Sequence, residues 1–173
     1  MATRDHVIKT RIRDLGAVAA RKGFAATTVA ATSQMAILVG ISVFPTGGLG
    51  GVRLHARKTW VESADLSALS QIPIMIVCSG VKSILDVGAI LERLETLNVG
   101  VVVYGSHQFP GFFLSKSGIT VDWSLSDPTE ITDVMAARRS FSIRSGLVIA
   151  HPLPAASQPP RSMARRMRYP DFS

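Results

Sequence analysis

The sequence is poor in cysteine and has no long apolar run. Cys78 is the single cysteine among 173 residues, which excludes an intramolecular disulfide and suits a reducing compartment such as the cytoplasm. We expect this thiol to lie in a buried strand and to be inert. No stretch approaches the roughly 18–20 apolar residues that span a membrane, and the N-terminus lacks the apolar segment of a secretory signal. The sequence therefore predicts no membrane partner.

Several motifs with familiar chemistry are also missing. The glycines of Thr46–Gly51 match neither the Walker A spacing nor the full G-x-G-x-x-G pattern of dinucleotide sites. They still favour positive φ angles and a close approach of backbone to a ligand, although a plain loop is the alternative. His55, His107 and His151 lack the spacing of metal ligands, so we interpret them as surface or loop residues. The order of the residues supports no Ser–His–Asp triad.

Acidic residues are fewer than basic ones. The 19 lysines and arginines exceed the 12 aspartates and glutamates and give a net charge of +7. This balance suits an anionic partner such as a nucleotide or a sugar phosphate. The arginines after residue 160 are interpreted as part of a solvated, disordered tail. Nucleic-acid binding through that tail is the weaker alternative, and it would make the affinity steeply salt-dependent.

Short apolar runs alternate with helical patterns. Strands are predicted at Ile41–Phe44, Ile74–Cys78, Val99–Tyr104 and Gly146–Ala150. Helices are predicted over 11–22, from Thr27-Thr28 to Gly40, from Lys82 onward, and over 128–139 with Asp127 as cap. The second of these helices is apolar almost all round, so we expect it to be buried. The alternation predicts an α/β fold with a mainly parallel sheet.

Lys82 follows the most apolar of these strands. Such sheets bind ligands at the carboxyl ends of their strands. A helix that begins at Lys82 would disfavour a second positive charge there, and apolar neighbours would act in the same direction. We therefore expect the pKa of Lys82 to lie below the usual value of about 10.4, which favours a nucleophilic neutral amine. A solvated residue at a helix start is the simpler alternative.

Several ordered strings resemble one family. They are Ala26–Thr32, Val43–Val52, Ser63–Leu66, Gly80–Asp86, Leu94–Thr96, Phe109–Phe113 and Ala150–Pro154. Over about residues 9–154 the chain resembles the pseudouridine-5′-phosphate glycosidases, also called the indigoidine synthase A-like family. The resemblance implies an α/β/α homotrimer in the cytoplasm that cleaves the C–C glycosidic bond of a phosphorylated nucleoside, with a divalent metal, typically manganese, assisting.

The resemblance also implies roles for individual residues. Lys82 matches the nucleophile that forms an imine with the ring-opened sugar, because a C–C bond needs an electron sink. Lys9, Val29, Ser63, Ala64 and Asp65 match substrate-binding positions. Taken alone, Lys9 is surface charge and Asp65 is a helix N-cap.

Some positions depart from the family pattern. The metal-binding aspartate is replaced by Val61, and the neighbouring Glu62 is expected to point elsewhere. Arg53 and His151 replace a histidine and an asparagine. We expect residues 1–154 to form the central part of a family domain without the general-acid glutamate, and 155–173 to form a basic tail.

Two functional classes follow from these departures. The first is a glycosidase of pseudouridine 5′-phosphate. The second is an impaired or inactive truncated paralogue that at most binds a phosphorylated nucleoside. Without a carboxylate at position 61, we predict weak or no specific manganese binding.

Overall fold

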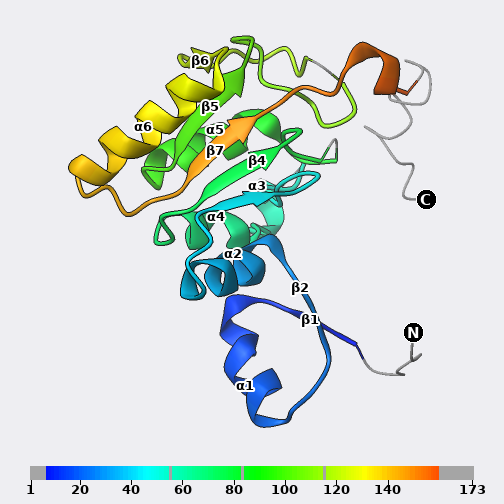
Figure 1. The fold of residues 1–173 in the computed structure, drawn as a ribbon. Coiled ribbons are helices and arrows are strands. Elements are labelled where there is room, and N and C mark those ends of the chain that lie inside the picture. Colours follow the sequence, from blue (N-terminus) through cyan, green and yellow to red (C-terminus); the bar gives the residue numbers. More distant parts are fainter. Residues whose placement is uncertain (1–6, 55, 83, 115, 160–173) are drawn as a thin grey trace.

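A five-stranded parallel sheet forms the centre of the computed structural model (Figure 1). The structure describes residues 7–159 except 55, 83 and 115. The sheet has the strand order β3-β4-β7-β5-β6, and every pair within it is parallel. Its strands are β3 (Val43–Pro45), β4 (Met75–Cys78), β5 (Gly100–Tyr104), β6 (Ser124–Leu125) and β7 (Leu147–Ala150). The predicted parallel sheet is confirmed, with strand boundaries shifted by one or two residues.

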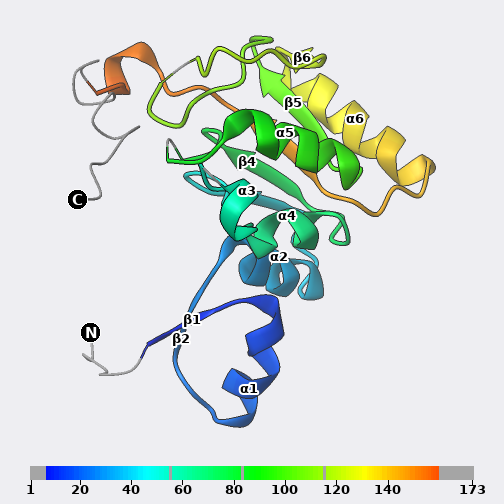
Figure 2. The same ribbon diagram turned by 180° about the vertical axis from the view of Figure 1, so that it is seen from behind.

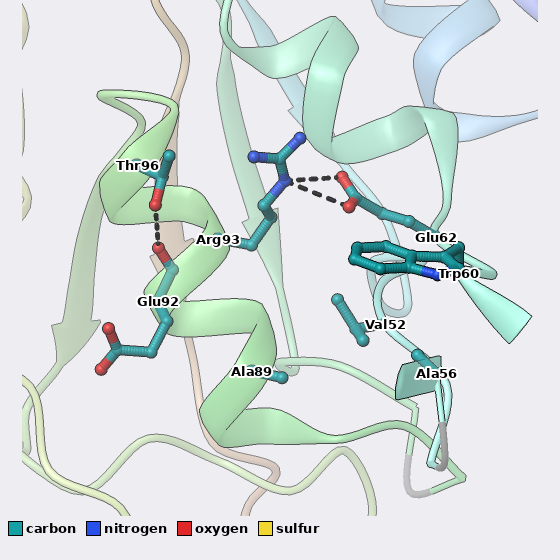
Figure 3. Close-up of a pocket in the computed structure, with 8 residues that line it drawn as sticks. All are labelled: Val52, Ala56, Trp60, Glu62, Ala89, Glu92, Arg93 and Thr96. Atoms are coloured by element: carbon teal, nitrogen blue, oxygen red, sulfur yellow. Dashed lines mark hydrogen bonds and ion pairs between the residues drawn. The ribbon is translucent and has the colours of Figure 1, made fainter. Parts of the chain in front are cut away.

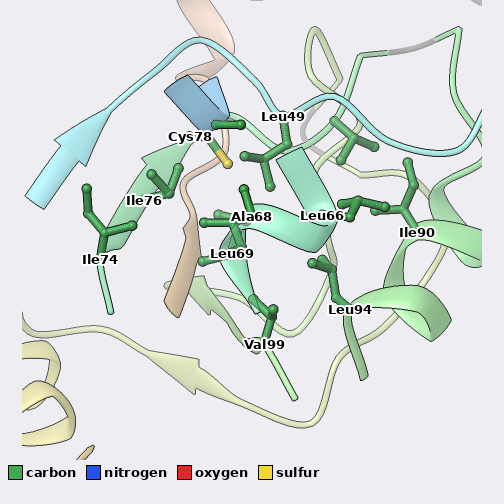
Figure 4. Close-up of a cluster of buried hydrophobic side chains, with 14 of the residues drawn as sticks. Leu49, Leu66, Ala68, Leu69, Ile74, Ile76, Cys78, Ile90, Leu94 and Val99 are labelled. Atoms are coloured by element: carbon green, nitrogen blue, oxygen red, sulfur yellow. The ribbon is translucent and has the colours of Figure 1, made fainter. Parts of the chain in front are cut away.

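The apolar, largely β-branched strands are buried because helices cover both faces of the sheet. On one face, α4 (Ala64–Leu69) and α5 (Val87–Thr96) enclose the larger core cluster (Figure 4). On the other face, α6 (Pro128–Ser140) packs Ile131, Val134 and Met135 against β5 and β7. All four residues of the central strand β7 are buried. The three-layer α/β/α prediction is therefore confirmed.

Helix α6 begins as its sequence predicts. Asp127 is the N-cap, Pro128 occupies the first turn, and the Glu130 carboxylate accepts from the Asp127 backbone N–H at 3.1 Å. This reciprocal capping box satisfies N–H groups that no carbonyl of the helix can reach.

The first part of the chain forms a separate projection (Figures 1 and 2). Strands β1 (Ile8–Thr10) and β2 (Ala25–Thr27) pair in parallel, and between them lie the 3-10 helix η1 (Ile12–Asp14) and α1 (Leu15–Ala20). The sequence did not predict this two-stranded sheet, because neither strand is an apolar run.

Helix α2 (Val29–Leu38) departs from its prediction in two ways. It begins one residue after Thr28, whose hydroxyl accepts from the Ala31 N–H at 3.3 Å, whereas Thr27 belongs to β2. The helix is also buried on one side only, because Leu38 keeps 74% of its surface exposed. The expectation of a fully buried helix was wrong.

The remaining elements are short. They are α3 (Ala56–Thr59), within the excursion after β3, and the 3-10 helix η2 (Ala155–Ser157). The rest of the predicted tail, from residue 160, lies outside the described residues. Within the part of the chain that the structure describes, no helix has the length and apolarity needed to cross a membrane.

Candidate active site

Lys82 lies at the carboxyl edge of the sheet, beside the glycine loop (residues 46–51), as predicted. Its neighbour Val81 forms a parallel bridge with Leu49, and the Leu49 N–H donates to the Gly80 carbonyl at 3.1 Å. The Lys82 side chain itself is exposed. The segment that follows β4 and the loop that follows β3 are therefore held together along their backbones.

The prediction that a helix begins at Lys82 was wrong. Helix α5 begins at Val87, where the Asp86 carboxylate caps it by accepting from the Ala89 N–H at 3.1 Å. Leu85, which had suggested helical spacing, forms an antiparallel bridge with Arg53. The helix-dipole argument for Lys82 therefore does not apply, because the effect fades beyond the first turn.

Three glycines of the loop, Gly48, Gly50 and Gly51, are required by packing rather than by φ. None of Gly47, Gly48, Gly50 and Gly51 has a positive φ, which corrects the prediction. A Cβ at Gly48 would lie 2.7 Å from the Phe112 ring. A Cβ at Gly50 would lie 2.6 Å from the Asp65 carboxylate, and one at Gly51 would collide with Ile90. The loop is glycine-rich because side chains from other segments of the chain pack closely against its backbone.

Gly80 makes the turn that leads to Lys82. Its φ is +98°, and a Cβ there would collide with the Pro110 carbonyl oxygen. Gly80 also forms an antiparallel bridge with Gly111, and the Phe112 N–H donates to the Ser79 carbonyl at 3.1 Å. The approach to Lys82 is thus fixed between the glycine loop and the 109–113 segment.

Asp65 joins three segments of the site. It is only 6% exposed, and its two carboxylate oxygens accept from the Ala30 N–H at 2.9 Å and the Gly50 N–H at 3.0 Å. The N-cap of α4 is Ser63, whose hydroxyl accepts from the Asp65 N–H at 3.2 Å, so Asp65 is not the cap. Its carboxylate ties the start of α2 to the glycine loop.

The structure gathers most of the predicted substrate positions around this carboxylate. Val29 precedes Ala30 at the start of α2, and Ser63 donates its N–H to the Gly51 carbonyl at 3.1 Å. Ala64 is the exposed first residue of α4. Lys9 instead lies exposed in β1, on the projection. The hydrogen bond from the Thr28 N–H to the Thr10 carbonyl, at 3.0 Å, links that projection to α2.

Residue 61 is a valine and offers no carboxylate ligand to a metal ion. Val52 and Glu62 form an antiparallel bridge, and the Glu62 carboxylate accepts from Arg93 Nε at 3.0 and 3.1 Å. Glu62 and Arg93 line a cleft of about 480 Å³ together with the exposed Trp60 (Figure 3). Within the described ranges, no three His, Cys, Asp or Glu side chains form a group that could hold a metal ion.

Sequence reasoning missed an aromatic pair at the same edge. The His151 ring stacks on the Tyr104 ring, with centroids 5.1 Å apart and planes inclined by 23°. His151 is exposed, and its backbone N–H donates to the Cys78 carbonyl at 2.7 Å. The pair forms because β7 lies between β4 and β5. The sequence alone could not give that strand order.

Cys78 ends β4 directly below this edge. Burial raises the pKa of its thiol to about 11, and a backbone hydrogen bond from Gly80 opposes that shift. The predicted burial of Cys78 is confirmed. A protonated, buried thiol is a poor nucleophile, so Lys82 is the better nucleophile candidate at this edge.

The sequence and the structure are both similar to one group of known proteins. Residues 1–168 match the profile of the family described as indigoidine synthase A like protein. A pseudouridine-5′-phosphate glycosidase from Salinispora tropica is 52% identical over 159 residues, which are 91% of this chain and 49% of that protein.

Two solved structures have the same fold. An indigoidine synthase A-like protein from Thermotoga maritima has a TM-score of 0.86 and 34% identity, and the match covers 94% of this chain and 55% of that one. The prealnumycin C-glycosynthase AlnA in complex with ribulose 5-phosphate has a TM-score of 0.88 and 28% identity, with coverage of 94% and 53%. The chain therefore spans about half the length of the relatives it matches.

Proposed function

Because the chain belongs to the indigoidine synthase A-like family, we propose that its carboxyl-edge site serves the cleavage of pseudouridine 5′-phosphate, with Lys82 as the nucleophile. The observation that carries the proposal is the position of Lys82, exposed at the sheet edge on a backbone clamped by Gly80 and Leu49. The relative from Salinispora tropica is named for this glycosidase activity. The sugar phosphate named with the C-glycosynthase supports a phosphorylated substrate.

The proposed chemistry begins with the ring-opened sugar. The unprotonated Lys82 Nζ adds to the anomeric carbon of the ring-opened sugar, to which the base is still bonded. The nitrogen lone pair then forms the C=N bond of the imine as the C–C bond breaks, and the electron pair of that bond stays on the base carbon. Water hydrolyses the imine afterwards, which frees the amine and releases the sugar phosphate as its aldehyde. The base carbon must gain a proton for uracil to leave, so this step also requires a general acid.

Neighbouring residues orient the sugar phosphate in this proposal. Val29, Ser63 and Ala64 present backbone beside the glycine loop, and Lys9 supplies positive charge from the projection. Asp65 acts through the backbone that it holds, because both of its oxygens already accept hydrogen bonds. It is therefore a positioning residue in this scheme.

The described residues do not fit the manganese site that the resemblance implies. Val61 offers no oxygen, and the Glu62 carboxylate is paired with Arg93. Divalent manganese prefers several hard oxygen ligands. The reaction proposed for this chain therefore uses no metal ion.

A second proposal is binding with little turnover by this chain alone. Val61 favours it, because it stands where the resemblance implies a metal-binding carboxylate. The imine requires only a placed amine, whereas release of uracil also requires the acid. From the resemblance to the family, we also propose that the chain assembles as a homotrimer in the cytoplasm.

Trapping with borohydride tests these proposals. The chain is incubated with ribose 5-phosphate and sodium borohydride, and the reduced adduct is located by peptide mass mapping. We expect slow labelling at Lys82 that Lys82→Ala removes and Lys22→Ala, which removes an exposed lysine near α1, leaves unchanged. Labelling spread over surface lysines and unaffected by Lys82→Ala would remove the nucleophile assignment. Rapid release of uracil from pseudouridine 5′-phosphate would overturn the second proposal.

A further inference from the structure

The segment that forms α2 and the edge strand β3 carries exposed apolar side chains and contains no charged residue. From Gly23 to Val52 the chain has no Asp, Glu, Lys, Arg or His in thirty residues. At the chain's charged content of 18%, about five charged side chains would be expected in such a stretch. Depletion of charge at exposed positions is typical of the centre of a protein interface.

Five side chains define this surface, which we call the uncharged face. They are Met35, Leu38, Val39, Ile41 and Val43, with 49%, 74%, 72%, 51% and 44% of their surfaces exposed. The first three lie at the end of α2, Ile41 follows the turn, and Val43 begins the edge strand β3. The stretch wraps the β3 edge of the sheet, beside which α2 lies in both views (Figures 1 and 2).

Exposed apolar side chains on a parallel sheet are unusual, because such sheets are normally covered on both faces. The backbone edge itself is protected, because β3 has three residues and ends in Pro45. The open surface is therefore made of side chains and not of an unpaired strand edge. Val43 faces the same side of the sheet as Met75 and Val77, but α6 packs against β5 and β7 instead. The β3 end of that face is therefore only partly covered: Ser42 lines a pocket with Met135 and Arg139 of α6, and Val43 keeps 44% of its surface exposed.

The match to known proteins indicates what covers this face. The Salinispora tropica relative has about as much chain outside the matched region as within it, whereas 91% of the present chain is matched. The two solved structures give the same proportion. A second copy of this chain is the other candidate occupant, and self-association through the same face would reveal it.

We infer that the uncharged face is the docking surface for the part of the family fold that lies outside the matched region. That complement would lay an apolar surface over the end of α2 and the β3 edge. Other exposed apolar side chains, such as Phe141 near Arg139 and Arg144, lie among charged residues and are not part of this surface.

A binding experiment in trans tests this inference independently of catalysis. The residues of the Salinispora tropica relative outside the match are co-expressed with the present full chain, and the complex is measured by affinity co-purification and sedimentation. Hydrogen exchange then reports protection of residues 35–43. We expect a one-to-one complex with slowed exchange there.

Substitutions on and off the face make the result specific. Leu38→Glu and Val43→Lys replace exposed side chains, so the fold is kept, and each should weaken the complex at least tenfold. Phe141→Glu is the matched control, because Phe141 is 77% exposed outside the face, and it should leave binding unchanged. Three results would overturn the inference: no complex, a complex that both face variants retain, or self-association of the present chain that Leu38→Glu abolishes.

Discussion

Replacement of Asp65 tests how the site is held together. Asp65→Ala removes the acceptor from two backbone N–H groups at once, the buried one of Ala30 and the partly buried one of Gly50. An unsatisfied buried donor costs about 1–3 kcal/mol, with the lower end applying to a partly wet group. The negative carboxylate also interacts favourably with the positive N-terminal end of the α2 dipole, which contributes about 0.3–1 kcal/mol of stability. We expect a loss of about 3–4 kcal/mol of unfolding free energy.

Asp65→Asn separates the two hydrogen bonds. The amide has nearly the same shape and keeps one carbonyl acceptor, but its NH₂ group must face the other backbone N–H. We therefore expect about half of the alanine effect, roughly 1.5–2 kcal/mol. Urea unfolding at constant m-value measures both variants, and hydrogen exchange at Ala30 and Gly50 should accelerate in each.

An exposed acid provides the control for Asp65. Glu62 pairs with Arg93, but both side chains are partly solvent-accessible, at 31% and 41%. Breaking such a pair costs about 0–1 kcal/mol. If Asp65→Ala were no more destabilising than Glu62→Ala, or if Asp65→Asn matched the parent chain, the role assigned to the carboxylate would be refuted.

Four further outcomes are expected. Ser33→Ala should be neutral or stabilising by up to about 1 kcal/mol in urea unfolding, because the buried Ser33 hydroxyl has no hydrogen-bond partner among the described residues. The Cys78 thiol should resist aromatic disulfide reagents in the native state; since folding raises its pKa from 9.0 to about 11, its contribution to stability is complete below pH 9 and disappears as the pH rises towards 11. Gly80→Ala should lose at least about 2 kcal/mol, because it combines a positive φ with a collision against Pro110. Calorimetry should detect no micromolar Mn²⁺ binding to the parent chain and stronger binding to Val61→Asp.

The sequence predicted the elements whose residues are buried on both sides. Strands β4, β5 and β7 are short apolar runs, and a buried parallel strand leaves that pattern because both of its faces need apolar side chains. Helix α6 was predictable because Asp127, Pro128 and Glu130 form its cap locally. In each case the sequence signal itself spans only a few neighbouring residues.

Features that depend on distant partners were not predictable from the chain alone. Asp65 was mistaken for a cap because its partners, Ala30 and Gly50, lie 35 and 15 residues away. The glycine loop was interpreted through φ, whereas Phe112 and Ile90 press on it from other segments. The start of α5 was misplaced for a different reason. Leu85 fits helical spacing by chance, although Asp86 is a good N-cap and could have been recognised.

The two groups of proposed site residues are held by different parts of the structure. The backbone around Lys82 is fixed by contacts within the described chain, from Leu49, Pro110 and Phe112. Lys9 lies instead on a two-stranded parallel sheet whose β2 residues are all exposed, and an isolated pair of strands is only marginally stable. In the proposed mechanism, imine formation at Lys82 would require the first group alone, whereas tight binding of a phosphorylated substrate would also require the second. Reactivity would then depend on the backbone around Lys82, whereas affinity would depend on what supports the projection.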